Sequence, residues 1–411
     1  MATLADSKSF RGIDPALMID FDYYSDRRYR EQGGIPQAMA TLRDEAPDLF
    51  WSTALGGYWV VQGHEAIVDA AVRTDLFSSG YMRIPARPDL PEPPLNVPLQ
   101  LDPPNHAAYR APLNAVFTPS QMYKRVDQIR ALAVELIEAI APLGEADFFD
   151  TVAEKLPVLI FIDIMGLERA HFREYRDMAK AAASEPDQEI RLKAVQAGSD
   201  LLAQVIAERR ANPRDDLISY LLDLEIEGEL VSDDRVLGYC KLLFFAGLDT
   251  VANAMSFIVH YLAKDQELQA RLRREPEKIP HAMEEMIRRH AVAPVVRIIA
   301  KDEDWRGMPL RKGDMALLNY PVANIDPRVF DHPDTVDIDR ERINHIAFGS
   351  GPHRCLGRHL ARIEIVAMLE ELLSRLPTFR LAPDAKVPMR GGGVLTIESL
   401  PLVWAAGQPA L

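Results

Sequence analysis

Apolar residues recur every three to four positions through most of the chain, which is the spacing of a helix with one buried face. Polar and charged residues fill the positions between them, as on helices that pack around a core. The pattern is clearest in Arg125 to Ala141, Asp200 to Arg210, Ser232 to Ala263, Ile279 to Arg289 and Leu356 to Leu376. The sequence therefore predicts a mainly helical protein.

Segments typical of β-strands are short and few. Leu49 to Ser52 and Tyr58 to Val61 flank a glycine-containing turn, which predicts a hairpin. Val296 to Ile299 and Met315 to Leu318 predict a second ribbon, with a turn at Lys312-Gly313-Asp314. The chain shows no repeat and no long linker. We therefore expect one large domain over residues 1–411, mainly α with minor β.

The segment from Pro85 to Pro104 departs from both patterns, because it holds eight of the 30 prolines. Proline fixes φ and lacks an N–H donor, so we expect an extended loop here rather than a helix. A loop of this length in a compact domain is usually functional, and a surface excursion is the plainer alternative.

The composition is that of a soluble globular protein: of 411 residues, 48% are hydrophobic and 26% are charged. The formal net charge of −14 would repel nucleic acid, so we expect no nucleic-acid partner. The first residues lack the features of a secretory signal, and Lys241, Asp249, Asn253 and His260 interrupt the longest apolar stretch. We therefore expect no membrane anchor and a cytoplasmic protein.

The chain has two cysteines, Cys240 and Cys355. This number excludes a disulfide framework, a zinc ribbon and a cysteine-held iron–sulfur cluster. Cys240 lies in an apolar helical segment and is expected to be an inert core residue. Cys355 lies in the glycine-rich, basic segment Phe-Gly-Ser-Gly-Pro-His-Arg-Cys-Leu-Gly at residues 348–357.

The surroundings of Cys355 favour a thiolate. The glycines let the backbone approach another group closely, and the helix predicted to begin just after Cys355 directs N–H groups at the sulfur. Both effects are expected to lower the pKa of the thiol. A thiolate in such a loop, backed by Phe348, suits an axial ligand to haem iron. Two alternatives remain here: a helix-capping loop with a chance cysteine, and a Cys–His nucleophile that uses His353.

The same segment resembles the haem-binding signature of the cytochrome P-450 family, Phe-Gly-x-Gly-x-His-x-Cys-x-Gly, at every fixed position. Three more family signatures follow the family's order along the chain. Ala246 to Thr250 resembles the oxygen-activation motif of a long central helix, Glu285 to Arg288 resembles the Glu-x-x-Arg motif, and Asp326 to Arg340 resembles the meander before the cysteine loop. The resemblance covers nearly the whole chain and is closest to the soluble bacterial camphor hydroxylases.

This resemblance implies the cytochrome P-450 fold and a monooxygenase that uses haem b. Cys355 would ligate the iron. The other residues expected to touch the haem are Phe348, Gly349 and Gly357 in the cysteine loop, and His106, Arg110, Arg297 and His353 at the propionates.

The resemblance also assigns roles to polar residues inside helices. Asp249 and Thr250 would guide protons during oxygen reduction, and Gly247 would let the helix open beside them. Two polar residues in the middle of an apolar helix, such as Asp249 and Thr250, lower the stability of the fold. Their presence by itself indicates a function or an ion pair. Glu285, Arg288 and Arg340 would form a buried structural cluster that supports the cysteine loop.

The implied reaction consumes O2 and two electrons, which bacterial members of the family take from a small acidic ferredoxin reduced by a flavoprotein reductase. A net charge of −14 would oppose that docking unless basic residues cluster. We expect such a patch beside Cys355, formed by Arg342, Arg354, Arg358 and Arg362, and an ordinary solvated helix face is the alternative.

The substrate pocket is expected opposite the cysteine, with mostly apolar walls that suit a small hydrophobic molecule. The tyrosine that holds camphor in the camphor hydroxylases aligns with Pro94, which donates no hydrogen bond, so we expect another compact terpenoid, such as a cineole-type ether. Tyr81 or Asn96 could supply a replacement donor. The expected pocket residues are Tyr81, Arg83, Ile84, Pro94, Asn96, Leu99, Leu242, Phe245, Leu248, Val295 and Val394.

Two other functions stay open. The first keeps the haem but replaces monooxygenation with peroxygenase or isomerase chemistry. Asp249, Thr250 and the arginine patch argue against it, because peroxide chemistry needs neither a proton relay nor a ferredoxin. The second is a haem-free binding protein or cysteine hydrolase, which would be colourless.

Overall fold

The computed structural model describes residues 12–31, 33–85, 95–185 and 187–406. Helices dominate it: α1 (Gly34–Glu45), α2 (His64–Val72), α3 (Asn105–Val116), α4 (Pro119–Tyr123), α5 (Val126–Ile140), α6 (Lys155–Met165), α7 (Phe172–Ser184), α8 (Gln188–Ala211), α9 (Leu217–Leu222), α10 (Asp233–Gly247), α11 (Thr250–Lys264), α12 (Gln266–Arg274), α13 (Ile279–Arg289), α14 (Tyr320–Ala323) and α15 (Arg358–Arg375).

The largest sheet has six strands in the order β1-β2-β3-β11-β8-β4. Their bounds are β1 (Met18–Ile19), β2 (Leu49–Ser52), β3 (Tyr58–Val61), β4 (Phe77–Ser78), β8 (Val295–Ile299) and β11 (Met315–Leu318). Both predicted ribbons lie in it as antiparallel pairs, β2 with β3 and β8 with β11. The parallel ladder between β3 and β11 joins the two ribbons into one sheet.

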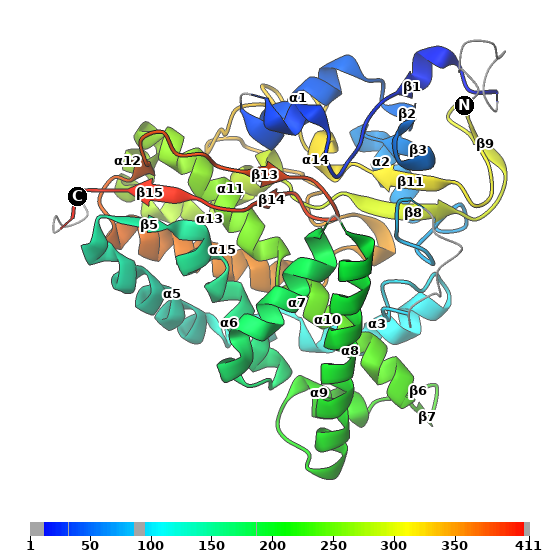
Figure 1. Cartoon of the computed structure of the whole chain (residues 1–411), viewed down its shortest axis with the longest axis horizontal. Helices are drawn as coiled ribbons and strands as arrows, with labels where there is room; N and C mark the ends of the chain where they lie inside the picture. The colour runs from blue at the N-terminus through cyan, green and yellow to red at the C-terminus, as the bar shows by residue number, and fades with distance from the viewer. Residues whose placement is uncertain (1–11, 32, 86–94, 186, 407–411) are drawn as a thin grey trace.

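The remaining strands form two- and three-stranded sheets: β5 (Glu145–Asp147), β6 (Glu225–Ile226), β7 (Glu229–Leu230), β9 (Glu303–Trp305), β10 (Met308–Leu310), β12 (Arg380–Leu381), β13 (Met389–Arg390), β14 (Thr396–Ile397) and β15 (Pro401–Val403). Figure 1 shows the six-stranded sheet with α1, α2 and α14 at one side of the molecule and most helices at the other. The mainly α architecture with a minor β part is thus confirmed.

The helix predicted over Ser232 to Ala263 is present but not continuous. It is divided at Leu248 and Asp249 into α10 and α11, and Asp249 has φ −120° and ψ −38°. Gly247 at the end of α10 packs against Phe161, where a Cβ atom would lie 2.6 Å from the ring. The break has a local cause as well, since the Thr250 hydroxyl donates to the carbonyl oxygen of Ala246 at 3.2 Å and competes with the helical ladder.

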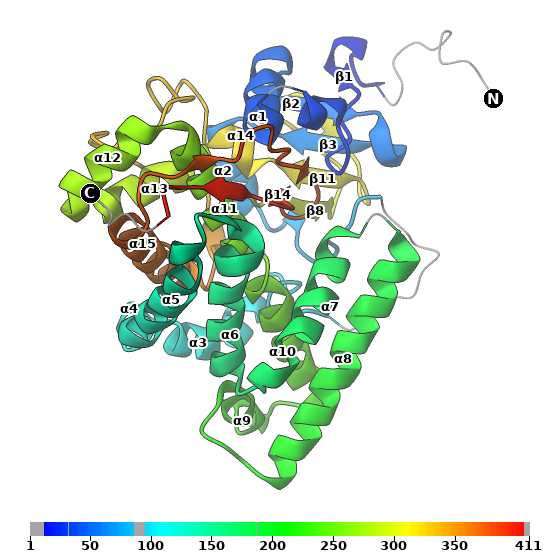
Figure 2. The same ribbon diagram turned by 60° about the vertical axis from the view of Figure 1, so that its left-hand side comes forward.

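Two other helix bounds also differ from the prediction. α8 begins twelve positions before Asp200, because the Asp187 side chain accepts hydrogen bonds from the N–H groups of Glu189 and Ile190 and so caps an earlier start. α15 begins at Arg358, and not directly after Cys355. In Figure 2, α7 and α8 lie side by side along one edge, with α10 behind them.

One apolar core connects the helical part to the sheet and includes residues from Phe21 to Trp404. A smaller core around Trp51, Trp59 and Trp305 lies on the other face of the sheet. The span Asp233–Lys264 is long and apolar enough to cross a bilayer, but 61% of its most apolar window is buried inside the fold. This helix pair therefore serves as an interior element that other helices cover.

Candidate active site

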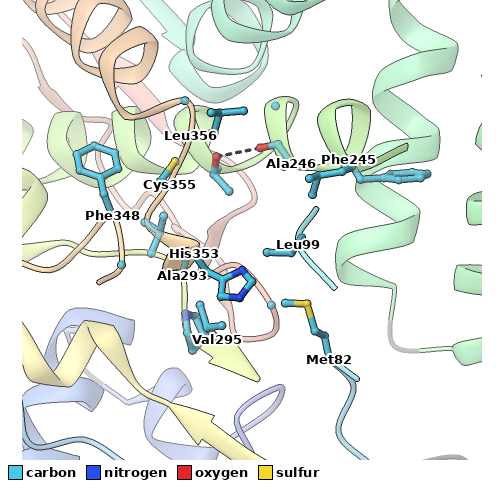
Figure 3. Close-up of a pocket in the computed structure, with 18 of the residues that line it drawn as sticks. Met82, Leu99, Phe245, Ala246, Ala293, Val295, Phe348, His353, Cys355 and Leu356 are labelled. Carbon is cyan, nitrogen blue, oxygen red and sulfur yellow. Dashed lines mark hydrogen bonds between the residues drawn. The ribbon is translucent and has the colours of Figure 1, made fainter. Parts of the chain in front are cut away.

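A cavity of about 670 Å³ lies between α10, α11, β8 and the cysteine loop. Figure 3 shows Cys355 and Phe348 on one side of it and Leu99, Phe245 and Met82 on the other. Segments far apart in the sequence therefore meet around a single space, which is large enough for an organic ligand.

Cys355 is held at this cavity by its own loop. Its N–H donates to the Phe348 carbonyl oxygen at 2.7 Å, and Arg358 Nη1 donates to the Cys355 carbonyl oxygen at 3.0 Å. Gly349 and Gly351 have φ values of 77° and 68°, so the two turns of the loop need glycine. Gly351 also packs against the Ala71 carbonyl oxygen, which a Cβ atom would approach to 2.5 Å.

The expected lowering of the Cys355 pKa is wrong for the protein chain alone. Burial raises the pKa of the thiol, and the Gly357 N–H together with Arg110, Arg358 and Arg362 opposes this only in part. The helix begins at Arg358, and the N–H group that reaches the sulfur is that of its N-cap residue, Gly357. A coordinated metal ion deprotonates a thiol outright, so the thiolate at this position depends on the metal.

The residues predicted at the haem propionates lie together and keep free donors. The rings of His106 and His353 are 4.2 Å apart. Within the described part of the chain, His106 Nε2 and both ring nitrogens of His353 are buried without a hydrogen-bond partner. Arg297 is 4% exposed, and its Nη1 donates to the neighbouring Val296 carbonyl oxygen at 2.9 Å.

Buried donors without hydrogen-bond partners lower the stability of the protein when no ligand is bound. An anionic ligand would supply the missing acceptors. Burial, the Arg297 charge and the neighbouring His106 lower the pKa of His353 to about 3, so His353 is neutral and can donate from one nitrogen. Arg110 completes the group, with Nη2 donating to the Arg354 carbonyl oxygen at 2.5 Å. These residues fit the two carboxylates of haem b at the edge of the cavity.

At the junction of α10 and α11, Gly247 and Thr250 line the cavity, whereas Asp249 directly precedes Thr250 and does not line it. Asn253 Nδ2 donates to Asp249 Oδ1 at 2.8 Å, whereas Asp249 Oδ2 is buried without a partner among the described residues. Burial raises the pKa of Asp249 to about 6, and the Arg390 charge opposes this rise. Asp249 is therefore a carboxyl group that can both bind and release a proton near neutral pH.

Glu285, Arg288 and Arg340 form the predicted cluster. Glu285 and Arg288 are fully buried, and both Glu285 oxygens accept from Arg288 at 2.8 Å. Arg340 Nε donates to both oxygens at 3.1 Å. Arg288 also donates to the carbonyl oxygens of Asn324, Pro333 and Thr335, so the cluster ties α13 to the segment before the cysteine loop.

Most of the predicted pocket residues line the cavity, but several do not. Arg83, Ile84, Asn96, Leu99, Leu242, Phe245 and Val295 are in its wall. Leu248 is 4% exposed and packs into the core at the helix break, while Tyr81 and Val394 lie beside the cavity without lining it, so these three predictions are wrong. Gly393, next to Val394, lines the cavity instead. Pro94 lies outside the described residues.

The predicted basic patch is smaller than expected. Arg342 and Arg354 are exposed, and Arg358 is partly exposed. Arg362 instead pairs with Glu284 through Nη2 at 3.0 Å and lies over the Phe348 ring at 4.5 Å. Including Arg362 as a free docking charge is therefore wrong, because its charge is neutralised and its guanidinium supports the cysteine loop.

Several polar residues of the cavity wall were missed by the sequence reasoning, among them Arg191, Lys241, His290 and Glu364. Glu364 is 1% exposed, and burial raises its pKa to about 8. Lys241 is 2% exposed. Lys241 interrupts the apolar segment of α10, but the sequence analysis used that interruption only as an argument against a membrane span.

The family model for cytochrome P450 matches residues 158–402. A steroid C26-monooxygenase from Mycobacterium tuberculosis is 34% identical over 356 residues, which are 84% of this chain and 94% of the relative. The crystal structure of CYP101J2 superposes with a TM-score of 0.88 at 29% identity and covers 97% of this chain and 100% of its own. That of CYP101C1 gives 0.87 at 32% identity, with the same coverage.

The chain therefore belongs to the cytochrome P450 family. It is a monooxygenase whose cofactor is haem b, and its reaction consumes O2 and electrons from a redox partner.

Proposed function

We propose that the whole chain forms one haem-thiolate monooxygenase domain in which Cys355 ligates the haem iron. The observation that carries this is the shared cavity: Cys355 lies at its wall, and the partnerless donors of His106 and His353 lie at its edge beside Arg297. When bound, the haem supplies reduction of O2 and insertion of one oxygen atom into a C–H bond. Phe348, Gly349 and Gly357 let it seat against the loop.

In this proposal, Asp249 and Thr250 control protons. The Asp249 carboxyl group is oriented by Asn253 at 2.8 Å and keeps one oxygen free among the residues described. The Thr250 hydroxyl donates to the Ala246 carbonyl oxygen and keeps its own oxygen available as an acceptor towards the cavity. The break at Leu248 and Asp249 interrupts the helix directly before Thr250, which lines the cavity.

The redox partner that the charge pattern favours is an acidic ferredoxin, reduced in turn by a flavoprotein reductase. Arg342, Arg354 and Arg358 lie on the cysteine loop side and remain exposed or partly exposed. Their charge would offset the overall repulsion that a net charge of −14 imposes. We place this soluble system in the cytoplasm.

The substrate that the cavity favours is a compact, mainly apolar, terpenoid-like molecule. Leu99, Leu242, Phe245 and Val295 supply apolar walls. The Asn96 amide also lines the cavity, and its Oδ1 has no partner in the part of the chain that the structure describes. The Nδ2 of the same side chain can donate to one oxygen of a bound ether or ketone, whereas Oδ1 can only accept, for example from a hydroxyl group.

A substrate screen by the haem spin-state change tests this proposal. Camphor, 1,8-cineole and 1-decanol are neutral and have ten carbons each, so they differ mainly in shape. The two compact compounds should shift the spin state at lower concentration and should be hydroxylated with ferredoxin and reductase present. Preference for 1-decanol would contradict a compact pocket. Turnover with peroxide but never with ferredoxin would favour the peroxygenase alternative.

A further inference from the structure

The longest helix that the structure describes, α8, contains a glycine. Gly198 lies near the middle of this helix and is buried. Glycine makes a helix less stable than alanine does, because the unfolded chain has more freedom to lose and no side chain packs in the folded state. A buried glycine at this position therefore indicates that another part of the protein needs the space of the missing side chain.

An aromatic ring from α10 uses that space. A Cβ atom at Gly198 would lie 2.9 Å from Cζ of Phe245, the far end of its ring. Carbon atoms in contact are usually separated by about 3.5–4.0 Å, so an added methyl group would force the ring and the helix apart by roughly 0.6 Å or more. Gly198 thus forms a notch in α8 that accommodates the tip of the Phe245 ring.

The notch lies beside the cavity. Val195, one turn before Gly198 on α8, lines the cavity, and so does Phe245 on α10. Figure 3 shows the Phe245 side chain pointing away from Cys355. Phe245 precedes Thr250 by five residues, which is about 7.5 Å along a helix axis. The position of this ring therefore determines how much room a ligand has on the α8 side of the cavity.

The packing around Phe245 favours displacement of its ring into the cavity if the notch were filled. The neighbouring ring of Phe244 lies 5.3 Å from it, edge to face. Phe244 is fully buried and packs in the same way against Tyr175 of α7 at 5.9 Å, so this side is already occupied. The cavity is the open space that the Phe245 ring adjoins.

We propose that Gly198 is a positioning residue for substrate size, because its notch keeps the Phe245 ring out of the cavity and leaves room for a bicyclic molecule. This inference rests on the proposed monooxygenase function and specifies the size of its substrate. A side chain at position 198 would turn the ring into the cavity and restrict the enzyme to smaller molecules. A shorter side chain at position 245 would make the notch unnecessary.

Two ligands that bind haem iron through a ring nitrogen test the inference: imidazole and 4-phenylimidazole, which differ by one phenyl ring. Their dissociation constants are measured on the haem-loaded enzyme from the shift of the haem absorption band. Gly198→Ala should weaken 4-phenylimidazole about 10-fold or more and imidazole less than about 2-fold. The reason is that only the larger ligand needs the space into which the Phe245 ring would move.

A second substitution tests whether the effect acts through the ring. Phe245→Leu in the Gly198→Ala background should restore the binding of 4-phenylimidazole, since a leucine side chain ends before the position of Cζ, and a double-mutant cycle measures this coupling. The matched control is Ala197→Ser, which adds one atom at an exposed neighbouring position of α8 and should leave both constants unchanged. Unchanged binding or equal weakening of both ligands by Gly198→Ala would overturn the inference, and so would the absence of rescue by Phe245→Leu.

Turnover separates this inference from the function on which it rests. The parent enzyme and Gly198→Ala are supplied with ferredoxin, reductase and either camphor or norcamphor, the same bicyclic ketone without its three methyl groups. Selective loss of camphor oxidation in Gly198→Ala would support both claims. Oxidation of both ketones in an unchanged ratio would retain the monooxygenase and reject the notch. The expected selectivity between the two imidazoles, without oxidation of either ketone by the parent enzyme, would retain the notch and reject the proposed function.

Discussion

Glu285 and Asp249 are both buried carboxylates on helices of the same core, yet their surroundings differ. Both oxygens of Glu285 accept hydrogen bonds from arginines, and Arg288 is itself bonded through all three nitrogens. Asp249 has one amide partner on one oxygen, and no described residue bonds to the other. A buried polar side chain whose hydrogen-bonding atoms all have partners stabilises the fold. A buried side chain with an unpartnered atom can still bind a proton or a ligand.

The same contrast holds for the positive charges. Arg288 is neutralised where it lies, and the aromatic ring of Phe330 covers it at 4.9 Å. His353, which lines the cavity beside Arg297, keeps both ring nitrogens without a partner among the described residues. Burial alone therefore does not distinguish a structural charge from a functional one, and the completeness of its hydrogen bonds does.

The largest effect is expected from Glu285→Gln, which leaves the Arg288 charge buried without its counter-charge. We expect the free energy of unfolding to fall by about 3–5 kcal/mol, together with loss of haem. Denaturant unfolding followed by circular dichroism measures the change. Asp339→Asn is the control, because this exposed carboxylate pairs with Arg271 and Lys278 in solvent and should change the stability far less. Equal effects of the two variants would break the comparison.

Asp249→Asn should affect turnover and not stability, which is the opposite of the result expected for Glu285→Gln. Its stability should equal or exceed that of the parent protein at pH 7, while turnover falls by about 100-fold, as expected when a proton-transfer group is removed. Thr250→Ala should bind substrate and consume reductant with most of the flux released as hydrogen peroxide. Product and peroxide are measured per reductant consumed. Unchanged rate and coupling in both variants would remove the pair from the mechanism.

The pH dependence of stability sharpens the comparison further. The pKa of Asp249 is about 6 in the folded chain against 3.8 as its ordinary value, so folding takes up a proton between these values. The stability that this proton provides is complete below pH 4 and is lost as the pH rises through 6, by roughly 3 kcal/mol at most. Asp249→Asn should therefore flatten the difference between pH 4.5 and 7 in urea unfolding. A variant with the same pH slope as the parent protein would contradict the raised pKa.

The fold could be read from the sequence because its signals are local. The period of the apolar residues located α5 and α13 nearly to their ends, and the β2–β3 hairpin has the predicted bounds. The period of the apolar residues did not indicate the break at Leu248 and Asp249; only the family resemblance, through Gly247, led us to expect the helix to open there, and the packing of Phe161 against Gly247 comes from a distant helix.

Site residues that belong to a sequence motif were predicted. Residues that reach the site only because distant segments meet at the cavity were missed. No acidic partner for Arg362 is evident from the sequence, but the fold places Glu284 within hydrogen-bonding distance of its guanidinium. Lys241 and Arg191 belong to no motif, and only the convergence of three segments makes them part of one wall.

The smallest effect is expected at the surface. Arg354→Glu with Arg358→Glu should raise the KM for an acidic ferredoxin several-fold and weaken its dependence on salt, since exposed charge pairs contribute about 0.2–1 kcal/mol each. Stopped-flow reduction at several salt concentrations measures this. Lys312→Glu with Lys386→Glu, at two exposed positions outside this patch, is the charge-matched control. Identical salt slopes for the double variant and the parent protein would reject the patch as the docking site.

The central claim is that Cys355 supplies the thiolate of a haem site, and the reduced carbon-monoxide spectrum tests it most directly. The parent protein should show the red-shifted band of thiolate-ligated haem. Cys355→His should retain haem and lose this band, while Cys240→Ser, at a cysteine buried in the core, should keep it. A Cys355→His protein that still shows the red-shifted band would contradict the account.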